Sequence, residues 1–150
     1  MRRAKNKSAG FTLIELMITL VVVAILTVIA FPSYLKFVQK GNRASAKQAV
    51  LELAAREESY YALNNAYTAT MTNMSYASAS ANPIPSSTQN YYSLSVSSVT
   101  AGATPGYVLQ AVPVTGSPQA TDACGTYQLD NLGNKTNLKG STTLSVSGCW

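Results

Sequence analysis

A chain of 150 residues with a formal net charge of +5 has room for one small domain and an appendage. Histidine is absent, which removes the usual general base and the commonest metal ligand, and only two cysteines are present. No serine or threonine has a base at a recognisable spacing, and neither a glycine-rich phosphate loop nor an acidic calcium loop occurs. The composition therefore predicts a protein that is not an enzyme and that holds no metal or cofactor.

The basic residues are concentrated ahead of the first apolar run. Four of the eleven lie within residues 1–10, namely Arg2, Arg3, Lys5 and Lys7. Without them, seven basic residues remain against six acidic ones, which leaves a charge of +1. We therefore assign most of the basicity to a targeting leader and not to a nucleic-acid surface.

Residues 11–31 form an apolar run of 21 residues in which Glu15 is the only charged one. A helix of this length spans roughly 31 Å, enough to cross a hydrocarbon core, and the basic flank places the leader on the cytoplasmic side. The alternative is an ordinary secretory signal peptide with a small-residue cleavage site at residues 28–30. Against it, the run is longer than a usual signal core, and a charge near its start does not serve a discarded segment.

Glu15 has two interpretations from the residues alone. Thr12 and Glu15 fit a capping box, in which the threonine and the glutamate close the first turn of a helix. A carboxylate inside a bilayer also costs on the order of 2.5 to 3.5 kcal/mol, so it predicts a function and a partner. The nearest candidate partner is the α-amine that cleavage before Phe11 would create.

The segment from Gly10 to Leu16, G-F-T-L-I-E-L, resembles the class III signal of type IV prepilins. The resemblance implies that prepilin peptidase removes residues 1–10 by cutting after Gly10 and that Phe11 becomes N-methylated. It also implies that Glu15 meets the N-terminal amine of a neighbouring subunit as pilins leave the inner membrane for the extracellular pilus. Residues 11–31 are then a membrane helix first and part of the filament core later.

Helical periodicity continues over residues 32–65. The apolar side chains of one face are Leu35, Val38, Ala46, Ala49, Val50, Leu53, Tyr60 and Tyr61. Asn64 and Asn65 predict a helix stop. Pro32 lacks an amide and Gly41 weakens a helix, so both predict a break, and the resemblance implies that the proline region loosens in assembled filaments.

A basic stripe runs beside this apolar face and consists of Lys36, Lys40, Arg43 and Lys47. Such a run is commonly a solvated face. Two functional alternatives are contact with lipid headgroups before assembly and contact with acids such as Glu57 and Glu58 of a neighbouring subunit.

Residues 66–150 predict a globular head. Residues 66–90 are low in charge and periodicity and predict a variable surface loop. Four strand candidates follow within residues 91–147, at residues 91–99, 107–114, 126–132 and 142–147. One long helix followed by short strands predicts an α+β fold, with the helix packed across a small antiparallel sheet of about four strands.

Cys124 and Cys149 behind an export signal predict one disulfide formed in an oxidising compartment. The 24 residues between them give a loop whose closure contributes roughly 3 to 4 kcal/mol in the chain-entropy model. Residues 124–149 thus form a disulfide-bounded region of the head.

Three short segments resemble the minor pilins grouped with PilE and the DNA receptor ComP. They are Cys124-Gly125, Gly148-Cys149-Trp150, and the run from Arg56 to Tyr61. The resemblance implies a structural subunit, most like a minor pilin, that supports pilus assembly, motility, adhesion or DNA uptake. Its implied partners are other pilins, prepilin peptidase, the inner membrane and the assembly machinery.

Two other functions remain open from the sequence. A DNA-binding pilin would use Lys135 and Lys139 with an exposed tyrosine or Trp150 as a stacking surface, although two lysines make a thin patch. A pseudopilin of type II secretion would share the whole N-terminus, but pseudopilins often lack a C-terminal disulfide.

Overall fold

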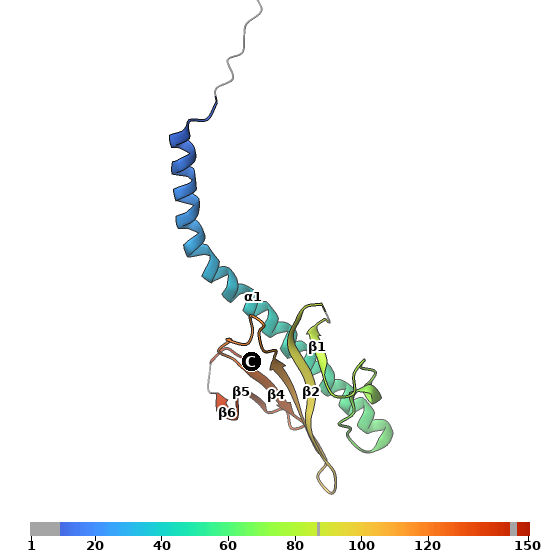
Figure 1. The fold of residues 1–150 in the computed structure, drawn as a ribbon. Coiled ribbons are helices and arrows are strands. Elements are labelled where there is room, and N and C mark those ends of the chain that lie inside the picture. Colours follow the sequence, from blue (N-terminus) through green and yellow to red (C-terminus); the bar gives the residue numbers. More distant parts are fainter. Residues whose placement is uncertain (1–9, 87, 145–146) are drawn as a thin grey trace, which may run out of the picture. The chain divides into compact units, whose positions relative to one another are not determined.

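The computed structural model describes residues 10–86, 88–144 and 147–150. These residues form one long helix, one short 3-10 helix and six strands (Figure 1). Phe37 and Val38 mark the boundary between two compact units. The predicted leader, apart from Gly10, and part of the last predicted strand lie outside the described residues.

Helix α1 spans Leu13–Asn64, and local hydrogen bonds explain both ends. At its start the Glu15 amide donates to Thr12 Oγ1 at 3.3 Å, so Thr12 caps the first turn as its sequence position predicts. At its end Asn65 takes a left-handed backbone conformation with φ of 52°, and its amide donates to the Tyr61 carbonyl at 2.8 Å. The helix therefore stops where the asparagine pair predicts.

Helix α1 continues through Pro32 and Gly41, so it does not end at either residue, and a kink or local melting there stays a prediction. A proline removes one helical hydrogen bond, and the strongly helical turns on both sides keep the remaining bonds in place. Loosening of this region in a filament stays a prediction.

All six strands pair antiparallel with their neighbours in the chain, giving one sheet in the order β1-β2-β3-β4-β5-β6. The strands are β1 (Asn82–Pro85), β2 (Asn90–Thr100), β3 (Gly106–Pro113), β4 (Thr126–Asp130), β5 (Lys135–Lys139) and β6 (Thr142–Leu144). The α+β prediction is confirmed, whereas the number of four strands is wrong.

The two strands that sequence patterning missed have atypical compositions. Strand β1 contains Pro83 and Pro85, which a central strand would not accept, but β1 lies at an edge of the sheet. Strand β5 has lysines at both ends and a buried asparagine in the middle, so it lacks the apolar alternation that identified β2 and β4.

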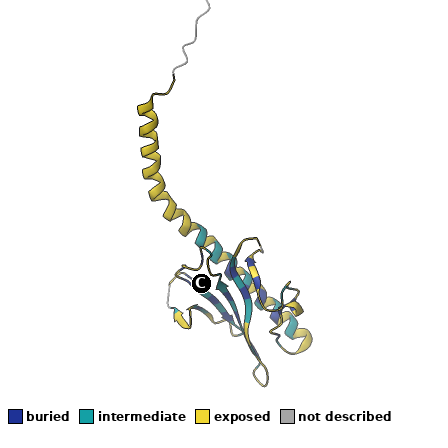
Figure 2. Cartoon of the chain, in the orientation of Figure 1, coloured by how far each residue is buried: buried dark blue, intermediate teal, exposed yellow. Residues whose placement is uncertain are grey.

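The core lies between α1 and the sheet in the unit that begins at Val38 (Figure 2). Its buried members on α1 and on the strands include Ala46, Val50, Leu53, Tyr92, Leu94, Leu109, Ala111, Tyr127 and Leu129. The predicted surface loop over residues 66–90 is wrong in part. Met71 and Met74 of the 3-10 helix Met71–Met74 and Ile84 of β1 are buried, because the thin core needs their side chains to cover it.

The disulfide joins Cys124, which precedes β4, to Cys149, which follows β6, with a Cα–Cα distance of 5.5 Å. Both cysteines are buried, and the Cys124 carbonyl accepts a hydrogen bond from Asn137 Nδ2 on β5 at 2.9 Å. The predicted pairing is confirmed, and the bridge joins the segment before β4 to the segment after β6, with Asn137 in the middle of β5 bonded to one end of it.

Candidate functional site

The N-terminal part of α1 is an exposed apolar helix. Every residue from Leu13 to Phe31 is exposed, and an 18-residue window has a mean hydropathy of 2.8 with none of it buried. Within the described ranges, α1 is the one helix long and apolar enough to cross a membrane. Figure 2 shows this part of α1 as exposed along its length.

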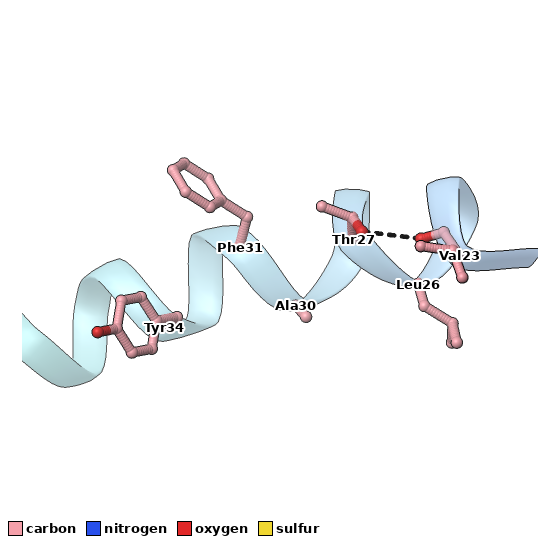
Figure 3. Close-up of a pocket in the computed structure, with 6 residues that line it drawn as sticks. All are labelled: Val23, Leu26, Thr27, Ala30, Phe31 and Tyr34. Atoms are coloured by element: carbon pink, nitrogen blue, oxygen red, sulfur yellow. Dashed lines mark hydrogen bonds between the residues drawn. The ribbon is translucent and has the colours of Figure 1, made fainter. Parts of the chain in front are cut away.

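Two threonines in this segment donate their hydroxyl groups to backbone carbonyls of the same helix. Thr19 Oγ1 donates to the Leu16 carbonyl and Thr27 Oγ1 donates to the Val23 carbonyl, each at 2.8 Å. The second bond lies beside an open hollow of about 440 Å³ on the helix (Figure 3), lined by Val23, Leu26, Thr27, Ala30, Phe31 and Tyr34. The outer surface therefore stays apolar and suits contact with lipid or with neighbouring helices.

Gly10 and Phe11, the predicted processing residues, lie before the first turn of α1. Both are exposed, and among the described residues no atom other than those of its chain neighbours lies within 4 Å of the position of a Cβ at Gly10. Glu15 is also exposed in the first turn, and neither ion pair in the described residues includes it. Gly10 and Phe11 are thus exposed residues outside the helix.

A buried ion pair anchors the head to α1. Asp122 has a fully buried side chain and receives a bidentate contact from Arg43, whose Nε lies 2.9 Å from Asp122 Oδ2. This hydrogen bond raises the pKa of Arg43, so the arginine stays charged. Tyr92 Oη and Gln119 Nε2 also donate to Asp122 Oδ2, at 3.4 Å and 3.1 Å. Side chains from α1, β2 and the loop before β4 thus share one carboxylate.

Of the interpretations that the sequence leaves open for the basic stripe, the solvated face therefore does not hold for Arg43. Arg43 lies three residues before Ala46 and seven before Val50, both of which are buried. That helical spacing places it at the edge of the apolar face, from which it reaches inward to Asp122.

The other carboxylates of the head also have partners inside the head or are buried. Glu52 pairs with Arg56 Nη2 at 2.7 Å, and Glu58 accepts hydrogen bonds from two tyrosine hydroxyls. Asp130 accepts the Leu132 and Asn134 amides of its own turn. Glu57 is fully buried, so of the two acids considered as contacts for the basic stripe of a neighbouring subunit only Glu58 remains a candidate.

The lysines, in contrast, have no ion-pair partner among the described residues. Lys40 on α1 and Lys135 and Lys139 on β5 are exposed, and Lys47 is half-buried. Each of the two ion pairs cancels one basic against one acidic residue, so the net charge of the head stays near neutral and its unpaired cations are these lysines.

Lys135 and Lys139 do not form one compact patch. They lie at opposite ends of β5, which places their Cα atoms roughly 13 Å apart. Lys135 Nζ lies 5.4 Å from the Trp150 ring centroid, and both residues line a hollow of about 410 Å³. Lys139 lines a different hollow, of about 330 Å³, with Gly125 and Gly140.

Trp150 is half-buried and tied in place. Its Nε1 donates to the Thr136 carbonyl at 3.0 Å, and its ring meets the Tyr127 ring edge-on at 5.4 Å. Burial raises the pKa of the Tyr127 hydroxyl to about 12, so that group stays protonated at neutral pH. Trp150 is a poor candidate for a freely accessible stacking surface, because protein groups occupy its ring.

Two parts of the chain match known protein families. Residues 5–31 match the prokaryotic N-terminal methylation motif, which agrees with the exposed Gly10-Phe11 junction and the apolar helix. Residues 32–128 match the family described as type IV minor pilin ComP, DNA uptake sequence receptor. The chain belongs to the ComP family of type IV minor pilins. As a type IV pilin, it is anchored in the inner membrane by its apolar helix and is then assembled into the extracellular pilus.

A curated relative is the type IV major pilin protein PilA of Myxococcus xanthus, which is 34% identical over 65 residues. The aligned part covers 43% of this chain and 30% of the relative, so the minor pilin spans under a third of that protein. The family match ends at residue 128, before Lys135 and Lys139.

Proposed function

We propose that this minor pilin binds DNA with its head while its N-terminal segment holds it in a type IV pilus. The family description supports DNA as the ligand. One observation points to particular residues. The acidic side chains of the head are buried or bonded to other groups of the chain. Lys135 and Lys139, in contrast, are exposed on β5 and have no ion-pair partner among the described residues. An ammonium group in that state is available to a phosphate.

The spacing of the two lysines indicates how they would act. At opposite ends of β5, they would contact separate phosphates and fix the strand along the DNA backbone. Two phosphate contacts make binding weak, and its salt dependence is modest because each contact contributes about 0.9 to the steepness with which log K falls against log salt. We infer that useful affinity comes from several pilins acting along one pilus or from further contacts in the disulfide-bounded region.

Replacement of both lysines, Lys135→Ala with Lys139→Ala, is expected to weaken duplex DNA binding and to lower the salt slope by about 2. Fluorescence anisotropy of a labelled duplex with the full processed chain in neutral detergent measures both quantities. The matched control is Lys40→Ala with Lys47→Ala, which removes the same charge from α1. Equal effects of the two pairs would mean that the pilin attracts DNA by net charge alone, and no binding of the wild-type chain at low salt would refute the DNA function.

We also propose that the chain is built into the filament with other pilins after processing by prepilin peptidase. The exposed Gly10-Phe11 junction supports processing, and the uncovered apolar helix supports burial against neighbouring helices. Glu15 would pair there with the amine of Phe11 in an adjacent subunit, because an isolated charge in a dry filament core is costly. The ComP match and the C-terminal disulfide favour a pilus subunit over a type II secretion pseudopilin.

Glu15→Ala is expected to leave cleavage and N-methylation intact but to reduce incorporation into sheared pili at least tenfold, a loss equivalent to about 1.4 kcal/mol. Intact-mass measurement of the membrane form tests the first part, and quantification in purified pili tests the second. Thr19→Ala, which removes a hydroxyl already bonded within its own helix, is the control. Normal incorporation of the Glu15 variant would contradict the proposed pairing.

A further inference from the structure

Glu57 is a charged residue type at a fully buried position. Its exposed fraction is 0%, and it lies on α1 where the helix faces the sheet. Arg43, Ala46, Val50, Leu53 and Glu57 follow one another at helical spacings of three and four, so Glu57 continues the buried stripe. Neither the DNA-binding proposal nor the assembly proposal uses this side chain.

Among the described residues, a single hydrogen bond reaches the Glu57 carboxyl group. Glu57 Oε2 accepts the amide of Thr68, itself nearly buried, at 3.2 Å. No group of the described residues donates to Glu57 Oε1. The contact joins α1 to the segment at residues 65–70, which leads from the end of the helix toward the 3-10 helix.

The charged and titratable groups around Glu57 provide no positive partner. Glu58 follows it on α1, and the hydroxyls of Tyr67, after the helix, and Tyr107, on β3, donate to Glu58 Oε1 at 3.2 Å and 3.1 Å. The adjacent Arg56 is directed elsewhere, to Glu52 and to the Met74 carbonyl. An ionised Glu57 would therefore be a buried charge beside a second negative charge, which is costly.

Burial raises the pKa of the Glu57 carboxyl group. The hydrogen bond from Thr68 opposes this shift, the charge of Glu58 adds to it, and the net direction is upward. The folded state then binds the proton more tightly than the unfolded chain. Protonated Glu57 therefore contributes fully to the free energy of unfolding at pH values below the ordinary carboxyl pKa. This contribution is lost as the pH rises through the raised value.

We propose that Glu57 is a proton-sensitive clasp: residues 65–70 stay packed against α1 while the carboxyl group is protonated and open to water when it ionises. The ionised group accepts the Thr68 amide more strongly, but this one bond does not offset the cost of an unpaired buried charge beside Glu58. The released segment carries Asn65, Ala66 and Tyr67. These residues form one wall of a hollow of about 260 Å³, whose other wall is the connection between β2 and β3. Ionisation therefore reshapes a surface hollow at this end of the head.

Glu57→Gln tests the clasp, because glutamine has the shape of the protonated side chain but cannot ionise. In the full processed chain in neutral detergent, the variant is expected to melt at least about 4 °C above wild type near about pH 8. The difference is expected to vanish near about pH 4, where wild-type Glu57 is protonated. Glu52→Gln is the matched control, since it removes an exposed carboxylate from the same helix and has no reason to show this pH dependence.

A second measurement follows the wild-type chain and does not depend on a variant. NMR of the Glu57 carboxyl carbon and the Thr68 amide is expected to show both titrating together, above the range of the other carboxyl groups. A Glu57 titration in the ordinary range, or a Thr68 amide that ignores pH, would overturn the proposal. An equal change in melting temperature at both pH values for Glu57→Gln would overturn it as well.

Discussion

Arg43→Met is expected to lower the free energy of unfolding by about 3 kcal/mol, since it leaves the fully buried Asp122 carboxylate without its cation. Loss of one partner of a buried ion pair commonly costs about 3 to 5 kcal/mol. The lower end applies here because a quarter of the Arg43 side chain is exposed and Tyr92 and Gln119 still donate to the carboxylate. Urea unfolding of the processed chain, followed by the fluorescence of its single tryptophan, measures the change.

Two further variants separate the ion pair from a general effect of charge. Lys47→Met removes a cation from the same helix, and this cation has no ion-pair partner among the described residues. The free energy of unfolding of this variant is expected to stay within about 0.5 kcal/mol of wild type. Adding Asp122→Asn to Arg43→Met is expected to recover part of the loss, because the buried group no longer carries a charge. An Arg43 variant as stable as the Lys47 variant would show that the pair contributes nothing to stability.

Removal of the disulfide has the other large expected effect. Cys124→Ala with Cys149→Ala is expected to cost about 3 to 4 kcal/mol, because the unfolded chain regains the freedom of the loop that the bridge closes. A domain with a core this thin has roughly 5 to 15 kcal/mol in total, so the variant approaches the unfolding threshold at growth temperature. The midpoint of urea unfolding, compared with and without reductant, measures the effect.

The reductant supplies the internal control for this second experiment. It is expected to lower the midpoint of the wild-type chain and to leave the double alanine variant unchanged, because that variant has no bridge to reduce. A wild-type midpoint that is insensitive to full reduction would contradict a stabilising role. In that case reduction could still loosen the structure locally around Trp150, which is adjacent to Cys149 and packs on Tyr127. Such a local change is measured as a shift in the tryptophan emission.

The features that could be predicted from the sequence are those whose signal is local. A few residues or a simple spacing are enough to identify each of them: the segment from Gly10 to Leu16, the apolar helix, and the cysteine pair behind an export signal. Strand β2 could be predicted because Tyr92 and Leu94 alternate with serines, which is typical of a half-buried strand. The family match and the structure confirm the pilin class, the α+β fold and the disulfide.

The remaining features depend on contacts between distant residues. Arg43 and Asp122 are separated by 79 positions, and no local pattern says that a lysine-rich helix face contributes one inward-pointing arginine. The spacing of Arg43 and Glu57 from Val50 and Leu53 did carry a signal, because it places both on the buried stripe. Residue type outweighed that spacing, since charged side chains are seldom buried. Strand β1 was missed for a similar reason, because its prolines are acceptable only at an edge.

The order of the strands has a consequence for the way the head folds. Each strand pairs with the one that precedes it in the chain, so the sheet can grow one hairpin at a time with short loop closures. The Arg43–Asp122 contact is different, because β1, β2 and β3 all lie between its two residues in the chain and its formation closes a loop of that length. We therefore expect rapid local assembly of the sheet, followed by a slower docking step that seats the segment around Asp122 on α1. Reduction of the cysteine pair should slow that last step more than the earlier ones.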